Sequence, residues 1–342
     1  MPVLPRSFSP AAVSRVALVN AIANGVIVVT GGAVRLTGSG LGCPTWPRCT
    51  GASFVATPEL AGHGDIEFGN RLLTFALTAA AVATVVAVFR SPRTDLRRLA
   101  VLSLLGIPAQ ALLGGVTVLT GLNPWTVAAH FLLSMVLVAV ATILWLRSRE
   151  PGVGQPLVRR PLVLLVAGIA AVTAVVLHQR AKEGDLPARA LVPAPLRRLA
   201  TGLLVLVAAT LVVGTVVTGS GPHSGDPKAG RTGFDPELVS QLHADVVFLL
   251  LGLTVALLVA LHATESPDRI RRAARDLLIV QLAQGVVGYV QYFTDLPIAL
   301  VLVHMLGAVL ITAFTARLVW SVRGPASELP ITPATEQAAA TR

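Results

Sequence analysis

Apolar residues are grouped along the chain in runs of roughly 18–25 residues, and short polar segments rich in arginine separate the runs. An α-helix needs a run of about that length to cross a hydrocarbon layer about 30 Å thick. The pattern therefore predicts an all-α membrane protein with eight transmembrane helices. They are expected at residues 14–34, 66–89, 98–119, 124–146, 197–218, 238–262, 272–293 and 297–320.

A ninth apolar stretch, residues 161–177, is only 17 residues long. Arg159 and Arg160 precede it, and Arg180 and Lys182 follow it. Basic residues at both ends favour a hairpin or an interfacial helix that enters from the cytoplasmic side and returns to it. A full crossing would also invert every later helix, so we expect none at this position.

The composition agrees with a membrane protein and excludes a conventional soluble enzyme or a disordered chain. Hydrophobic residues make up 54% of the sequence and charged residues 13%, against about 25% charged residues in soluble domains. The net charge of +10 does not indicate nucleic-acid binding, because no basic stripe in the sequence carries interleaved aromatic residues.

Most basic residues fall on one side of the predicted membrane. If the N-terminus is cytoplasmic, 22 of the 27 Lys and Arg residues lie in inner segments, and 5 lie in outer segments or helix ends. This bias predicts a multi-pass cell-membrane protein with both termini in the cytoplasm. The first apolar run continues beyond Ala21-Ile22-Ala23, so we expect an uncleaved span there and not a secretory signal.

The two halves of the chain can be aligned with each other. The matches are Val34–Gly40 with Thr215–Gly221, Gln110–Val116 with Gln281–Val287, and Pro124 with Pro297. Four spans per half give both repeats the same direction, which predicts two tandem four-helix bundles related by a pseudo-twofold axis along the membrane normal. The expected divisions are an N-terminal half (1–146), a cytoplasmic linker with a short apolar insertion (147–195), a C-terminal half (196–322) and a flexible cytoplasmic tail (323–342).

Three histidines, His130, His243 and His304, lie inside predicted spans, each about 9–10 Å below the outer surface. The duplication pairs His130 with His304 and pairs His243 with Asn70. The C-terminal half therefore offers two imidazoles at one depth on two helices, and this arrangement suits axial ligation of a haem iron. A single intramembrane histidine is equally compatible with a hydrogen-bonded packing role.

The N-terminal half carries a carboxylate near its outer surface. His63, Glu67 and Asn70 have the spacing i, i+4, i+7, which places them on one helical face if the helix extends back to His63. Two interpretations remain open for Glu67. It is either a carboxylate that reaches the interface and pairs with Arg71, or a catalytic carboxylate beside a bound substrate.

Both cysteines of the chain, Cys43 and Cys49, lie in one short segment that is predicted to be on the outer side. Such a pair is a disulfide candidate where the segment faces an oxidising compartment, and two free thiols are the alternative.

The run Gly31–Cys49 closely resembles the signature of the heme A synthases. Other matching parts are Glu67 with Asn70-Arg71, residues 110–122, Pro124-Trp125 before His130, and Val217–His223. The resemblance covers residues 14–320 and implies a membrane enzyme that oxidises a ring methyl of heme O to a formyl group, giving heme A with oxygen drawn from water. It also implies that the C-terminal half holds haem b through His243 and His304.

In the N-terminal half, the resemblance implies that heme O binds near His130 and that Glu67 is catalytic. This chain departs from the family pattern, because Asn70 stands where a second histidine is usual. The substrate would then be held by His130 alone or with His63. Arg35 and Arg71 are outer-side candidates for its propionates. Expected partners are heme O, heme A and membrane lipid, with heme O synthase, oxidase assembly factors and a second copy of the chain as further candidates.

Two other classes of function explain part of the pattern. A non-catalytic di-haem cytochrome b that carries electrons would use His243 and His304, but it has no use for Glu67 or the cysteine segment. A transporter would also contain tandem repeats, but it would place broken helices and charged pairs near the membrane midplane. Neither feature is evident in the sequence.

Overall fold

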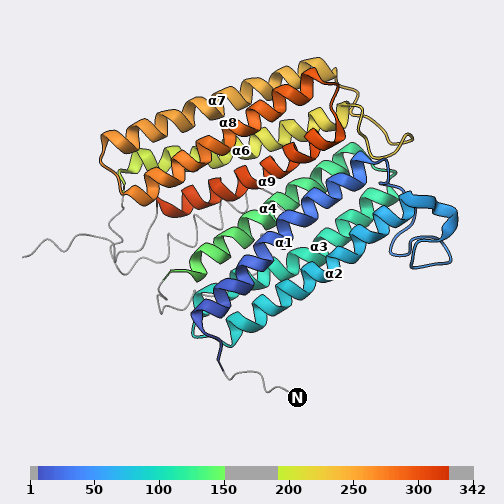
Figure 1. Cartoon of the computed structure of the whole chain (residues 1–342), viewed down its shortest axis with the longest axis horizontal. Helices are drawn as coiled ribbons and strands as arrows, with labels where there is room; N and C mark the ends of the chain where they lie inside the picture. Colours follow the sequence, from blue (N-terminus) through green and yellow to red (C-terminus); the bar gives the residue numbers. More distant parts are fainter. Residues whose placement is uncertain (1–6, 151–191, 323–342) are drawn as a thin grey trace, which may run out of the picture.

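A computed structural model describes residues 7–150 and 192–322, and eight long helices lie within these ranges (Figure 1). The predicted hairpin at 161–177 and the tail after residue 322 fall outside the described residues. The elements are α1 (Pro10–Leu36), α2 (Ala61–Phe89), α3 (Arg97–Leu119), α4 (Pro124–Ser148), α6 (Ala194–Ser220), α7 (Pro236–Ala263), α8 (Asp268–Phe293) and α9 (Ile298–Ser321), with 3-10 turns η1 (Pro58–Leu60) and η2 (Thr94–Leu96).

Each predicted span lies within or close to one of these helices, so the all-α architecture is confirmed. Seven helices are long and apolar enough to cross a membrane. The exception among the described helices is α8, where six of the first nine residues are charged and three glutamines follow, at Gln281, Gln284 and Gln291. It nevertheless packs between α7 and α9 and runs alongside them (Figure 1).

The helices form two groups of four that share one interface. In the first group α1 contacts α2 and α4, and α3 contacts α2 and α4; in the second, α6 contacts α7 and α9, and α8 contacts α7 and α9. The groups meet where α1 and α4 pack against α9 and where α4 packs against α6. A small apolar core of Val28, Met135, Val138 and Val309 fills this interface.

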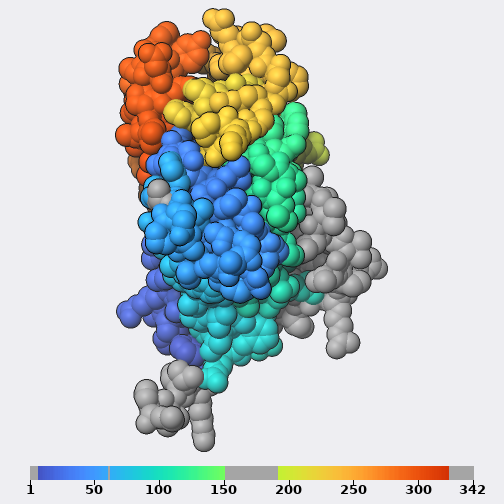
Figure 2. Space-filling model, turned by 90° about the vertical axis from the view of Figure 1, so that its right-hand side faces the viewer, coloured from blue at the N-terminus to red at the C-terminus, as the bar shows by residue number. Residues whose placement is uncertain are grey.

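The connections after α1 and α6 lie side by side at one end of the molecule (Figure 2). The Gly40 N–H donates to the Gly225 carbonyl at 2.9 Å, and the Arg35 side chain donates to the carbonyls of His223 and Thr218. His223 Nε2 in turn donates to the Leu296 carbonyl at 2.9 Å. One chain of hydrogen bonds thus joins the two halves at the end that carries the cysteine loop.

A buried charged network closes the opposite end. Arg93 makes two hydrogen bonds to the Asp95 carboxylate, at 2.9 and 3.0 Å, and both side chains are buried. Arg93 also donates to the carbonyls of Arg147 and Glu150, which follow the last turn of α4 or lie in it. Carbonyls at a helix C-terminus have no partner within the helix, so this guanidinium satisfies them. The Glu150 side chain accepts from Trp320 of α9 at 2.6 Å, which extends the network into the second half.

Asp95→Asn should reduce the free energy of unfolding by about 2–4 kcal/mol, because it leaves the Arg93 guanidinium buried without its counter-charge. Thermal unfolding of the purified protein in detergent measures the change. Asp65→Asn is the matched control, because Asp65 is exposed in the first turns of α2, far from the Arg93–Asp95 network. Equal melting temperatures for the two variants would show that the network contributes little to stability.

Candidate functional site

The cysteine loop between α1 and α2 is closed by a disulfide. Cys43 and Cys49 are joined with an S–S distance of 1.98 Å, and both residues are fully buried. The candidate disulfide of the sequence is thus present. The closed loop lies against the first turns of α2, where the Gly64 carbonyl is 4.0 Å from the Cys43 sulfur.

Glu67 fastens this loop to α2. One carboxylate oxygen accepts the Cys43 backbone N–H at 2.6 Å, and the other accepts from Arg71 at 2.6 Å. Arg71 also donates to the carbonyls of Cys43 and Thr45 in the same loop. The pairing with Arg71 that the sequence left open is therefore present. Glu67 is 6% exposed, so these two charge-assisted hydrogen bonds lie where little water competes for the carboxylate.

Two other candidate residues from the sequence, His63 and Arg35, have hydrogen-bond partners other than Glu67 and Asn70. The helix α2 does extend back to His63, as one face through all three residues requires, but the exposed His63 ring is hydrogen-bonded to Ser39 at 2.9 Å. It stands about two helical turns from Asn70. Arg35 points to the second half and binds backbone carbonyls there. The structure thus brings Arg71, but not Arg35, to the Glu67 carboxylate.

Asn70 and the three intramembrane histidines share one local geometry. Each side chain lies over a glycine of the preceding helix, so close that a methyl group built on that glycine would meet it. A methyl carbon on Gly31 would lie 3.8 Å from Asn70 Nδ2. The corresponding distances to a histidine Cε1 atom are 3.1 Å from Gly114 to His130, 3.2 Å from Gly214 to His243 and 3.3 Å from Gly288 to His304. Each half therefore has two such positions, on helices α2 and α4 or on α7 and α9.

The same four side chains each keep a buried polar atom without a hydrogen-bond partner in the described structure. These atoms are Asn70 Oδ1 and Nδ1 of His130, His243 and His304. A buried polar group left without a partner is costly, so four at equivalent positions call for a functional explanation. Among the described helices, α2 does not touch α4 and α7 does not touch α9. The two members of each pair thus belong to helices that lie diagonally across their bundle.

The contacts also correct the register of the internal alignment. Gln110 donates to the His130 carbonyl at 3.0 Å, and Gln284 donates to the His304 carbonyl at 2.8 Å. Gln284, and not Gln281, is therefore the counterpart of Gln110. With this pairing, glutamine, glycine and histidine of the second half each follow their counterparts by 174 residues: 110 and 284, 114 and 288, 130 and 304. The first alignment was wrong here because it matched Gln110 to Gln281, which lies one turn before Gln284 in α8.

This correction identifies Gln284, whose role the sequence analysis missed. In both halves a glutamine is followed four residues later by glycine, and sixteen residues after that by histidine. The identical spacing could have been read directly from the chain. The backing glycines Gly31 and Gly214 had no comparable signal, because they precede their partners by different intervals, 39 and 29 residues.

No cluster of three or more histidine, cysteine or carboxylate side chains that could hold a bare metal ion occurs in the part of the chain the structure describes. What the fold and the site define is a multi-pass α-helical membrane protein. It has paired buried polar positions, three of them histidine, in its two helical groups and a disulfide-closed loop at one end.

Residues 14–179 match the sequence model of the COX15-CtaA family, described as cytochrome oxidase assembly protein, and over this stretch the chain is similar to that family. Similar proteins include the heme A synthase of Bacillus pumilus (strain SAFR-032), 34% identical over 142 residues, or 40% of this chain and 45% of the relative. The heme A synthase of Listeria welshimeri is 33% identical over 128 residues (36% and 42%), and that of Lysinibacillus sphaericus is 33% identical over 123 residues (35% and 39%). The chain thus spans less than half the length of these relatives.

Proposed function

We propose that this protein is a heme A synthase, which converts a ring methyl of heme O to a formyl group. The observation that carries the proposal is the set of four glycine-backed positions with unpartnered buried atoms, found in a chain whose similar proteins are named heme A synthases. The net change, CH3 plus water to CHO, releases four electrons and four protons. In this balance water supplies the oxygen atom, and the four electrons pass to an acceptor outside the chain.

The proposal includes a duplicated architecture in which α1–α4 and α6–α9 are related by a pseudo-twofold axis. Its divisions are an N-terminal half (1–146), a linker (147–195), a C-terminal half (196–322) and a tail (323–342), and the ends of α4 and α6 extend two residues into the linker. The same set of contacts supports it in each half. It links Gln110, Gly114 and His130 in the first half and Gln284, Gly288 and His304 in the second. In this arrangement α8 is an eighth crossing that packs between α7 and α9. The charge bias of the connections favours cytoplasmic termini and sites toward the outer face.

In the C-terminal half, His243 and His304 would hold haem b through their imidazoles. Both fit this role, because their buried ring nitrogens lack hydrogen-bond partners and they belong to diagonal helices of one bundle. Haem b bound there would supply one-electron redox chemistry. The residues' own task is positional, since Gly214 and Gly288 leave room for the rings and fix how far each imidazole lies from the neighbouring backbone.

In the N-terminal half, His130 would hold the substrate haem, while Asn70 occupies the position equivalent to His243. An amide is a poor iron ligand, so the substrate would have one strong protein ligand, and heme O would bind less tightly than a resident group. A weaker hold suits a molecule that must leave as product. His63 is a less suitable second ligand, because its ring is bound to Ser39.

Glu67 would act beside the substrate as a carboxylate. It can accept a proton from the attacking water or stabilise positive charge that develops as the methyl group is oxidised. Arg71 and the Cys43 N–H hold both carboxylate oxygens in place through short hydrogen bonds. The disulfide loop would thus position the reactive group through one backbone hydrogen bond.

Gly288→Ala should lower the haem b content of the purified protein or shift its absorption spectrum, because the new methyl group would stand 3.3 Å from the His304 ring. Gly285→Ala is the matched control on the same helix, since nothing lies within 4 Å of a methyl group there. His304→Ala and His243→Ala should each remove haem b while the protein still inserts. Normal haem b in both histidine variants would overturn the ligand assignment.

Purified protein supplied with heme O and an electron acceptor should form heme A, whereas Glu67→Gln should not. The Gln side chain keeps the shape and one acceptor for the Cys43 N–H, but it removes the negative charge. We expect a loss of about 1–2 kcal/mol of stability, retained haem b in the other half, and no formyl product. Chromatography of extracted haems measures the product.

Two results would change the assignment. A Gln variant that makes heme A at the wild-type rate would leave Glu67 with only its structural role. A wild-type protein that binds haem b but yields no hydroxylated or formylated haem would favour a di-haem electron carrier.

A further inference from the structure

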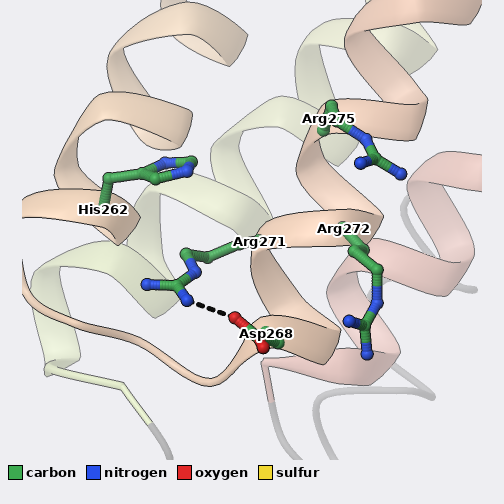
Figure 3. A pocket seen from close by; sticks show the side chains of 5 residues that line it. All are labelled: His262, Asp268, Arg271, Arg272 and Arg275. Atoms are coloured by element: carbon green, nitrogen blue, oxygen red, sulfur yellow. Dashed lines mark hydrogen bonds and ion pairs between the residues drawn. The ribbon is translucent and has the colours of Figure 1, made fainter.

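A cavity of about 390 Å³ lies between the end of α7 and the start of α8, and its lining is almost entirely basic (Figure 3). His262 comes from α7, whereas Asp268, Arg271, Arg272 and Arg275 come from α8. His262 is nineteen residues after His243 on the same helix, so the cavity is almost 30 Å from the histidine sites. None of the residues proposed for haem oxidation lines it.

The cavity has a surplus of positive charge. Three arginines face one aspartate, so the lining carries two net positive charges even with His262 neutral. Arg271 uses the Asp268 carboxylate (Figure 3), and Arg275 shares Asp276 with Arg317. Within the described ranges Arg272 forms no ion pair, and its side chain is exposed. This guanidinium is therefore accessible to an anion in the cavity.

Apolar surface continues from the cavity along both helices. On α8, Arg272 and Arg275 are followed at spacings of four, three and four by Ile279, Leu282 and Val286, all exposed. On α7, the exposed residues Val259 and Val255 precede His262 by three and seven positions. These intervals keep each set on one helical face. The basic cavity therefore stands at the end of two exposed apolar stripes, at the level where a spanning helix reaches the headgroups.

We propose that this cavity binds the headgroup phosphate of an anionic glycerophospholipid, whose acyl chains lie along the stripes of α7 and α8. The arginines match the phosphate charge, and each contributes about a fivefold preference near a membrane surface. A free phosphate ion would use the arginines but not the stripes. A zwitterionic lipid would use the stripes but carries no net charge. The charge bias of the connections assigns the site to the inner leaflet.

The test compares phosphatidylglycerol with phosphatidylcholine of the same acyl chains, added to the purified, delipidated full chain. Native mass spectrometry measures bound lipid, and thermal unfolding measures stabilisation. We expect phosphatidylglycerol to bind more tightly than phosphatidylcholine. Arg272→Gln/Arg275→Gln should lose tenfold or more in phosphatidylglycerol affinity, with phosphatidylcholine binding unchanged.

The control variant, Arg15→Gln/Arg90→Gln, removes the same charge from exposed positions on α1 and at the end of α2. It should bind phosphatidylglycerol like the wild type. An equal loss in this control, or wild-type affinity in the cavity variant, would overturn the site. Stabilisation by inorganic phosphate as large as that by the lipid would overturn the lipid assignment. Should the double variant melt early in phosphatidylcholine, Arg272→Gln alone decides, because Arg272 is exposed and unpaired.

Discussion

Close approach between a planar side chain and a bare helix backbone organises this molecule. Four times, a glycine on one helix allows an imidazole or amide of the next helix to lie within van der Waals contact of the backbone. The helix pairs concerned, α1·α2, α3·α4, α6·α7 and α8·α9, are adjacent in sequence and in space. At the three histidine positions an added side-chain carbon would stand only 3.1–3.3 Å from the ring, so these glycines help to set the spacing of each helix pair and the direction of the imidazoles. The interior of each bundle follows from them.

The N-terminal half adds a second constraint, because one carboxylate serves both the loop and the proposed chemistry. Glu67 binds the loop backbone at Cys43 and the Arg71 guanidinium at the same time. A side chain with both oxygens occupied has little freedom to move, and this rigidity favours a group that must meet its substrate in one orientation. It also means that loss of the carboxylate affects loop position as well as reactivity, so stability and turnover need separate measurement.

Much of the fold was predictable, because apolar runs of spanning length are strong local signals. The eight helices fall where the pattern placed them, although α2 and α8 begin five and four residues earlier, where polar first turns gave no apolar signal. The disulfide was also accessible, since only two cysteines exist. The partners of Arg35 and His63 were not, because these side chains, at the end of α1 and the start of α2, contact segments whose positions depend on the path of a loop. The register of α8 failed for a related reason: Gln281 and Gln284 are one turn apart, and only the contact with the His304 carbonyl distinguishes them.

The two halves are tied together at both ends, by Arg35 with the loop after α6 at one end and by Trp320 with Glu150 at the other. A pair of bundles joined in this way cannot rotate or separate about a hinge at either end. The gap between the histidine positions of the two halves is therefore fixed by the packing of α1 and α4 against α6 and α9. Under the proposed function, an electron that passes between the halves would cross a constant distance, so its transfer would not wait for a motion of the protein.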